Sequence, residues 1–182
     1  MLGVVFTEFV EMVEDQFSME MADTILESSQ LASGGSYTAV GSYDSGEILA
    51  LVTALSEASG EPIPDLVRSF GRHLFGRLVL GHPVVVKNLH SSLDLLVGVE
   101  RHIHTEVRKL YPNAELPSFH VERHDSERIT MHYDSTRPLA GLALGLIEGC
   151  ADHFQETLEI DHIDTSDGSG CSATFHITRV SR

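Results

Sequence analysis

The stretch YDSTR, residues 133–137, follows an alternating run at residues 128–132 and comes directly before a proline. Because proline disfavours the helical region for the residue that precedes it, this pattern predicts an extended chain through Arg137. Residues two apart in a strand point to the same face, so Tyr133, Ser135 and Arg137 should form one row roughly 13 Å long. The row offers a phenol, a hydroxyl and a guanidinium, and the guanidinium suits a carboxylate or a phosphate. A half-exposed strand with polar residues outward is the other interpretation of this pattern taken alone.

The composition is typical of a soluble globular protein, since 42% of the 182 residues are hydrophobic and 21% are charged. This length suffices for one domain with a sizeable core. The net charge of −15 argues against nucleic acid and against an anionic membrane as partners, because both require clustered lysine and arginine. The chain begins without the basic segment of a signal peptide, and its longest apolar run, residues 139–147, is too short to span a bilayer. We therefore expect a cytoplasmic location and no membrane segment.

The order of apolar patterns predicts helices first and then strands. Helical spacing of apolar residues indicates helices over residues 2–16, 18–31, 45–59, from 62 to about 80, 88–110 and 139–156. Alternating stretches indicate two hairpins, formed by residues 119–123 with 129–133 and by residues 158–163 with 172–178. This order predicts an α+β protein in which an N-terminal helical lobe packs on a C-terminal four-stranded antiparallel sheet with helices. We expect residues 1–182 to form a single domain.

Two of the predicted helices carry features of special interest. Gly71 lies in the middle of the fourth helix, where glycine costs up to about 1 kcal/mol against alanine. Either another backbone comes close at this position or the helix bends there. In the helix over residues 88–110, the predicted buried stripe consists of Leu89, Leu93, Leu96, Ile103, Val107 and Leu110.

His102 and His104 form an H-x-H pattern on that same helix. Side chains two apart on a helix point about 200° away from each other, so these two histidines do not readily chelate one metal ion. His104 lies beside the apolar stripe, whereas His102 lies nearer the charged side. A histidine on an apolar border is either a satisfied core residue or, alternatively, a single axial ligand to a haem.

The sequence resembles the H-NOX family at several places. The matching segments are HTEVRKLYP at residues 104–112, Pro117, YDSTR at residues 133–137 and LGLIEG at residues 144–149. H-NOX proteins are haem nitric oxide/oxygen binding domains, related to the haem domain of soluble guanylate cyclase. The resemblance covers essentially the whole chain, and it is specific because the histidine-to-proline spacing accompanies the Y-x-S-x-R pattern.

The resemblance implies a haem b cofactor (iron protoporphyrin IX) between the two lobes. It implies that His104 is the proximal ligand to the iron and that Tyr133, Ser135 and Arg137 hold the haem propionates. It further implies that Pro117 presses on the macrocycle and distorts it. A row with a carboxylate-binding guanidinium agrees with this role for the YDSTR stretch.

The resemblance also implies a distal gas pocket formed by four apolar residues, Val5, Phe9, Leu74 and Leu142. Oxygen-binding members of the family place a tyrosine at the position matched by Leu142. An apolar pocket implies selectivity for nitric oxide, with carbon monoxide also bound. Ordinary core is the other interpretation of these four residues. Some family members have a cysteine-rich zinc site, but here His162 and Cys171 lack further ligands, so we predict no zinc.

We therefore interpret the chain as a stand-alone, non-enzymatic sensor of nitric oxide. The resemblance implies a separate partner, a histidine kinase or a diguanylate cyclase, and lobes that pivot about Gly71. One alternative is a haem enzyme acting on peroxide or nitric oxide, which would require a polar acid–base group over the iron. Another alternative is a haem-free interaction domain, against which the intact His104 and YDSTR stretch argue.

Overall fold

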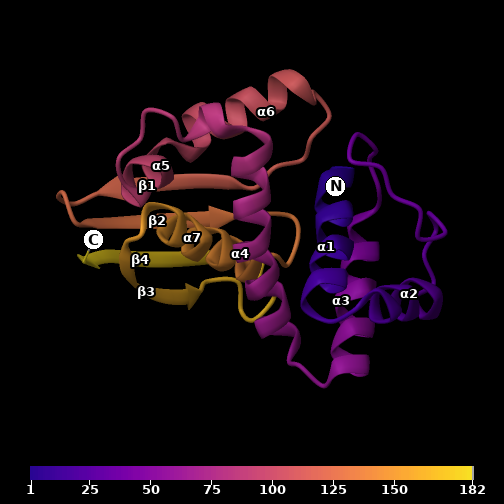
Figure 1. Ribbon diagram of the computed structural model, residues 1–182. Helices are drawn as coiled ribbons and strands as arrows, with labels where there is room; N and C mark the ends of the chain where they lie inside the picture. The colour runs from indigo at the N-terminus through magenta and orange to yellow at the C-terminus, as the bar shows by residue number, and fades with distance from the viewer. Residues whose placement is uncertain (182) are drawn as a thin grey trace. The chain divides into compact units, whose positions relative to one another are not determined.

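The computed structural model describes residues 1–181 and comprises two compact units, Met1–Phe70 and Gly71–Arg182. Figure 1 shows helices in the first unit and a sheet with helices in the second. The first unit contains α1 (Gly3–Gln16), α2 (Met19–Ser28), α3 (Ser45–Ser59) and the beginning of α4 (Ile63–Gly81), which continues into the second unit.

Helix boundaries in the first unit follow local capping chemistry. The Asp44 side chain accepts a hydrogen bond from the Gly46 N–H at 2.7 Å and so caps α3. Gly60 ends the same helix in the left-handed conformation, with φ of 80°, which costs glycine little. The start and end predicted for this helix are confirmed.

Helix α1 buries one apolar stripe, in which Phe6, Phe9 and Val13 are fully buried while Val5 is half-buried. The ring of Phe9 meets that of Phe70 edge-on, with centroids 5.1 Å apart. Edge-to-face pairs of this kind are favourable beyond the area that they bury. Phe9 is thus a packing residue of the first unit.

The second unit is built on a four-stranded sheet with the order β1-β2-β4-β3 and all neighbours antiparallel. Its strands are β1 (Ser118–Arg123), β2 (Arg128–Asp134), β3 (Thr157–Asp164) and β4 (Ser172–Ser181). Its longest complete helix is α7 (Ala140–Phe154), which lies between β2 and β3 in the chain. Both predicted hairpins and the α+β class are therefore confirmed. Among residues 1–181, no helix is both long and apolar enough to cross a bilayer.

Helices α5 (Ser92–Gly98) and α7 contribute to the same core as one face of the sheet (Figure 1). The fully buried side chains of this core include Leu93, Ile129, Met131, Cys150, Phe175 and Ile177. Helices α4 and α7 approach closely, because a Cβ at Gly71 would lie 2.4 Å from the Leu142 carbonyl oxygen. Of the two explanations for a glycine in the middle of α4, the structure shows a close backbone approach.

The single helix predicted over residues 88–110 is wrong in two respects. The helical segment begins only at Ser92, after the 3₁₀ turn η1 (Pro83–Val85) and a turn, and the Ser91 side chain caps it by accepting from the Asp94 N–H at 3.1 Å. The segment is then divided into α5, a π-helix η2 (Val99–His104) and α6 (Thr105–Leu110). Leu110, expected in the buried stripe, is 68% exposed. Apolar periodicity does not reveal a π-turn, which widens the helix by one residue and rotates everything that follows.

The prediction that the chain stays extended through Arg137 is also wrong. Strand β2 ends at Asp134, and residues 136–138 form a bend. The Ser135 N–H donates to the Cys171 carbonyl at 2.8 Å, and the Leu139 N–H donates to the Arg137 carbonyl at 2.8 Å. These bonds turn the chain toward α7.

Candidate functional site

His104 ends the π-helix η2 and is the buried member of the H-x-H pattern, with 9% of its surface exposed, whereas His102 is exposed. The inward and outward directions expected for the pair are thus observed. π-turns are frequent at functional sites, where the additional residue redirects a side chain. The structure therefore presents one imidazole, rather than two, to the interior of the second unit.

The Nδ1 atom of His104 lies 3.0 Å from one carboxylate oxygen of Glu100, one turn earlier in the helix. The same oxygen accepts the Phe119 backbone N–H at 3.2 Å, and the other oxygen accepts the Arg108 guanidinium at 2.9 Å. With Nδ1 engaged, Nε2 remains as the nitrogen available to a ligand, and no hydrogen bond to it is found among residues 1–181.

The protonation states of this pair suit metal binding. Burial lowers the pKa of His104 and outweighs the opposing effect of Glu100, so the net pKa lies below its ordinary value. Burial raises the pKa of Glu100, but hydrogen bonds from Arg108, His104 and the Phe119 backbone outweigh it and lower the net pKa. At neutral pH the contact is thus a hydrogen bond from a neutral imidazole to a carboxylate. A neutral imidazole is the form that binds a metal.

Aromatic contacts connect His104 to the YDSTR stretch. The Phe119 ring lies 5.6 Å from the His104 ring and 5.5 Å from the Tyr133 ring, between centroids. Phe119 and Tyr133 are direct cross-strand partners in β1 and β2, so the sheet register fixes their proximity. Burial raises the pKa of Tyr133 above its ordinary value, which keeps the phenol protonated and able to donate.

The buried side of the YDSTR stretch alternates as expected although the strand has ended. Tyr133 is buried and Ser135 and Arg137 are half-buried, whereas Asp134 and Thr136 are exposed. The Ser135 hydroxyl accepts the Arg137 backbone N–H at 3.0 Å, so the bend is stabilised from within. A serine or threonine hydroxyl often closes such a local turn.

The guanidinium of Arg137 binds an acid in this structure. It donates to the Glu115 carbonyl at 2.7 Å and also to the Glu115 carboxylate. One nitrogen of the Arg137 guanidinium thus binds a backbone carbonyl and another binds one carboxylate oxygen, and a guanidinium is suited to acidic groups of this kind. Pro117 lies in the same loop, two residues after Glu115 and two before Phe119. The chain on either side of it is held by hydrogen bonds, from Arg137 to the Glu115 carbonyl and from the Phe119 N–H to Glu100.

The four residues expected to form a distal pocket divide between the two units. Val5 and Phe9 belong to α1 in the first unit, and Leu74 and Leu142 belong to α4 and α7 in the second. Phe9 and Leu74 are buried, and Val5 and Leu142 are half-buried. All four are apolar, and each is at least partly shielded from solvent within this structure.

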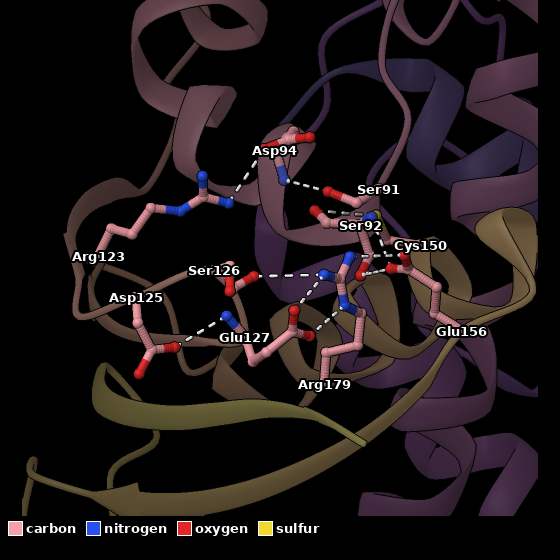
Figure 2. Close-up of polar contacts among 10 residues, drawn as sticks. All are labelled: Ser91, Ser92, Asp94, Arg123, Asp125, Ser126, Glu127, Cys150, Glu156 and Arg179. Atoms are coloured by element: carbon pink, nitrogen blue, oxygen red, sulfur yellow. Dashed lines mark hydrogen bonds and ion pairs between the residues drawn. The ribbon is translucent and has the colours of Figure 1, made fainter. Parts of the chain in front are cut away.

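A polar network anchors the helix that leads to His104 (Figure 2). Glu156, whose side chain is 1% exposed, accepts the Ser92 N–H at 2.9 Å and the Ser92 hydroxyl at 2.6 Å on one oxygen. Its other oxygen accepts the Arg179 guanidinium at 2.9 Å. Arg179 also forms a bidentate pair with Glu127, at 2.7 and 2.8 Å. The start of α5 is thereby tied to β4 and to the turn between β1 and β2.

Two further contacts extend this anchor. Asp94 in α5 accepts the Arg123 guanidinium from β1 at 3.0 Å, and the Cys150 thiol in α7 lies 3.8 Å from the Ser92 carbonyl (Figure 2). Burial raises the pKa of the Cys150 thiol far above its ordinary value. Cys150 therefore remains a protonated core residue at neutral pH.

Sequence reasoning missed Glu100, Phe119 and Glu115 as members of this site. The separation of four residues between Glu100 and His104 is the helical spacing at which side chains meet, and it was the available signal. No comparable signal marked Phe119 or Glu115, because their contacts depend on strand register and loop path. Within residues 1–181, no group of three or more histidine, cysteine, aspartate or glutamate side chains could hold a metal ion.

The donor set of the second unit fits a haem, which requires one imidazole nitrogen, an apolar or aromatic wall and a cation for its carboxylates. His104 supplies the nitrogen, Phe119 and Tyr133 supply aromatic surface, and Arg137 supplies the cation.

Comparisons with known proteins agree with this chemistry. The model of the HNOB family, described as haem-NO-binding, matches residues 2–162. The chain is 47% identical to the H-NOX protein of Shewanella woodyi, whose solution structure is in the Fe(II)CO state, with a TM-score of 0.84 over 99% of this chain and 95% of that one. It is 36% identical to an Fe(II) unliganded H-NOX protein from K. algicida, with a TM-score of 0.93 over 100% and 98%. The H-NOX protein of S. oneidensis in its Fe(II)NO state is 29% identical, with a TM-score of 0.91 over the full length of both chains. Curated proteins give no match.

Proposed function

Because this chain belongs to the haem-NO-binding (H-NOX) family, we propose that it is a non-enzymatic, haem-based sensor of nitric oxide. Residues 1–182 form one such domain in this proposal, which the full-length similarity to single H-NOX proteins supports. The cofactor is haem b. When bound, ferrous haem supplies the iron to which a diatomic gas coordinates.

The observation that carries the proposal is the state of His104. Its ring is buried and neutral, its Nδ1 is held by Glu100, and its Nε2 is left to bind iron. A metal-bound histidine generally donates its second nitrogen to a carboxylate or carbonyl group, which fixes the ring and its tautomer. The nitrogens of a buried histidine usually have hydrogen-bond partners within the protein, so an imidazole with only Nδ1 engaged supports a ligand at Nε2.

In this proposal, Tyr133, Ser135 and Arg137 bind the two propionates. The phenol and the hydroxyl donate hydrogen bonds, and the guanidinium adds charge. The pairing of Arg137 with the Glu115 carboxylate supports this role, because it places an acidic group against the guanidinium. Pro117, held between Glu115 and Phe119, presses on the macrocycle.

We further propose that Val5, Phe9, Leu74 and Leu142 face the bound gas. All four lack a hydrogen-bond donor. Oxygen on ferrous haem takes on partial negative charge and gains from a donor, whereas nitric oxide binds strongly through the iron bond alone. An apolar distal side therefore favours nitric oxide and carbon monoxide over oxygen.

The signal passes to a separate histidine kinase or diguanylate cyclase in the cytoplasm. The two-state element in this proposal is the segment η2 that ends at His104, and Gly71 is the pivot. Gly71 packs tightly against the Leu142 carbonyl. This close contact supports Gly71 as a position where α4 and α7 move together.

Replacing His104 by glycine tests the proposal. The variant should lose haem, or retain it only when imidazole is added to replace the missing ring. The His102→Gly variant is the matched control, because His102 is exposed on the same segment, and it should keep the wild-type spectrum. A five-coordinate ferrous spectrum in the His104→Gly variant without imidazole would contradict the assignment.

A further inference from the structure

We propose that Glu100 is a positioning residue that fixes the tautomer of His104 and, balanced by Arg108, sets the strength of the bond between His104 and iron. This inference rests on the proposed function, since it requires that His104 bind haem iron. It concerns the residues behind the imidazole rather than the ligand itself.

The position of Glu100 calls for an acceptor without any donor. Three donors converge on its carboxylate: the imidazole Nδ1 of His104 at 3.0 Å, the Phe119 backbone N–H at 3.2 Å and the Arg108 guanidinium at 2.9 Å. An ionised carboxylate accepts all three. A glutamine would turn its NH₂ group toward at least one donor, so neutral side chains of the same shape cannot satisfy this arrangement.

The carboxylate also joins three elements of the second unit. Glu100 and His104 belong to η2, Arg108 belongs to α6, and Phe119 belongs to β1. The Thr105 hydroxyl donates to the Glu100 carbonyl at 3.3 Å, which adds a partner for the backbone within this widened turn. Through Glu100, the orientation of the imidazole is fixed by contacts with the sheet as well as by its own helix.

The two charges act on the imidazole in opposite directions. A carboxylate that accepts from Nδ1 raises the basicity of the ring and strengthens Nε2 as a ligand. Arg108 binds the other oxygen of Glu100 and withdraws part of that negative charge. With haem bound, this balance would set how strongly Nε2 of His104 holds the iron, and hence the fraction of the nitric oxide complex that would keep His104 as a ligand.

The test uses the full-length ferrous protein with its haem and three variants. Glu100→Gln removes the charge, Arg108→Met removes the withdrawing partner, and Glu106→Gln is the control. Glu106 lies on the same helical segment and pairs with Lys109 on the exposed side, away from His104. The measurements are the iron–histidine stretching frequency by resonance Raman, the rate of haem transfer to an acceptor globin, and the Nδ1–H resonance of His104 in the Fe(II)CO form.

Glu100→Gln should lower the stretching frequency, move the Nδ1–H resonance upfield and speed haem transfer by roughly 10- to 100-fold, the usual cost of losing such a carboxylate. Arg108→Met should raise the frequency and increase the fraction of nitrosyl protein that keeps His104. Glu106→Gln should leave all three measurements at their wild-type values. A packing role for Glu100 would not produce opposite shifts in the first two variants.

Shifts of equal sign in Glu100→Gln and Arg108→Met, or unchanged frequencies in both, would overturn the inference while leaving the His104 assignment intact. If Glu100→Gln fails to fold, Arg108→Met decides, because 44% of the Arg108 side chain is exposed and its removal leaves the carboxylate in place. A wild-type protein that binds no haem through His104 would instead refute the proposed function itself, so the two failures are distinguishable.

Discussion

Replacing Arg179 by methionine should destabilise the second unit, because it removes the guanidinium that binds the buried carboxylate of Glu156. Glu156 has 1% of its side chain exposed, and Arg179 has 11%. The Arg179 guanidinium binds Glu156 at 2.9 Å and Glu127 at 2.7 and 2.8 Å (Figure 2). Methionine matches much of the apolar length of arginine, so the change removes the charge and the hydrogen bonds more than the packing.

The expected cost follows from the environment of each partner. Removing one member of a buried ion pair costs roughly 3–5 kcal/mol, because it leaves an uncompensated buried charge. Here the bonds from Ser92 to Glu156 remain, and Glu127 is about half exposed to solvent. We therefore expect the lower end, about 3 kcal/mol, which lowers the midpoint of thermal unfolding by roughly 6–12 °C in a chain of this size.

The assay is urea unfolding followed by far-UV circular dichroism, with the midpoint and the slope fitted separately. The control is Arg72→Met, which removes a pair with Asp152 at 2.6 Å whose side chains are 51% and 55% exposed. An exposed pair of this kind contributes less than about 1 kcal/mol. Both variants lose one arginine from the second unit, so the difference between their free energies of unfolding reports the effect of burying the ion pair.

The double variant Glu156→Gln/Arg179→Met completes the cycle. Removing both charges should recover much of the stability lost in Arg179→Met, because no buried charge then remains. If Arg179→Met costs no more than Arg72→Met, or if the double variant is less stable than Arg179→Met alone, the buried pair is not what anchors α5.

Three more predictions concern gas selectivity, haem retention and acid stability. Leu142→Tyr should raise oxygen affinity roughly ten- to a hundredfold if its hydroxyl donates to bound oxygen, because such a hydrogen bond is worth about 1.5–3 kcal/mol. Ferrous spectra in air and under argon measure this affinity. A stable oxygenated complex in the wild-type protein would refute the apolar pocket. Arg137→Ala should speed haem loss more than Ser135→Ala, since charge-assisted bonds are worth about 1.5–3 kcal/mol and neutral ones about 1; equal transfer rates to an acceptor globin would argue against propionate binding by Arg137. Burial raises the pKa of Glu156, but the Ser92 and Arg179 hydrogen bonds outweigh it, so the pKa in the folded protein lies below that in the unfolded chain. The ionised carboxylate therefore stabilises the protein above about pH 4.3, and this stabilisation is lost as the pH falls through the folded pKa. The stability difference between wild type and Glu156→Gln, measured by urea unfolding, should shrink from about pH 5 downward.

Much of the fold was open to prediction because its signals are local. Capping residues and a terminal glycine determine the two ends of α3, and both hairpins follow from alternation interrupted by turn residues. The prediction of one helix over residues 88–110 was wrong at its start and in its middle, and both errors also have local causes. A serine cap at Ser91 competes with the apolar pattern before it, and the π-turn at Val99–His104 leaves that pattern almost unchanged.

The candidate site was predictable only in part. His104 and the YDSTR stretch carry motif spacing and sidedness that a sequence displays directly, and the burial of Tyr133 and His104 agrees with that sidedness. Glu100, at helical spacing from His104, lay within reach of the same reasoning. Phe119 and Glu115 did not, because an aromatic residue in a strand and an acid in a loop occur in most proteins without any role in a site.

The sequence by itself determined the ends of α3, both hairpins, the single inward histidine and the buried side of the YDSTR stretch, because each depends on residues within a few positions of one another. The tertiary structure alone decided which distant groups meet. Glu156 reaches Ser92 across 64 residues, the Phe119 N–H reaches Glu100 across 19, and Gly71 accommodates the Leu142 carbonyl. These contacts depend on strand register and on helix packing, which bring together residues far apart in the chain, so no local pattern records them. In a strand, a slip of one residue would turn every side chain to the opposite face.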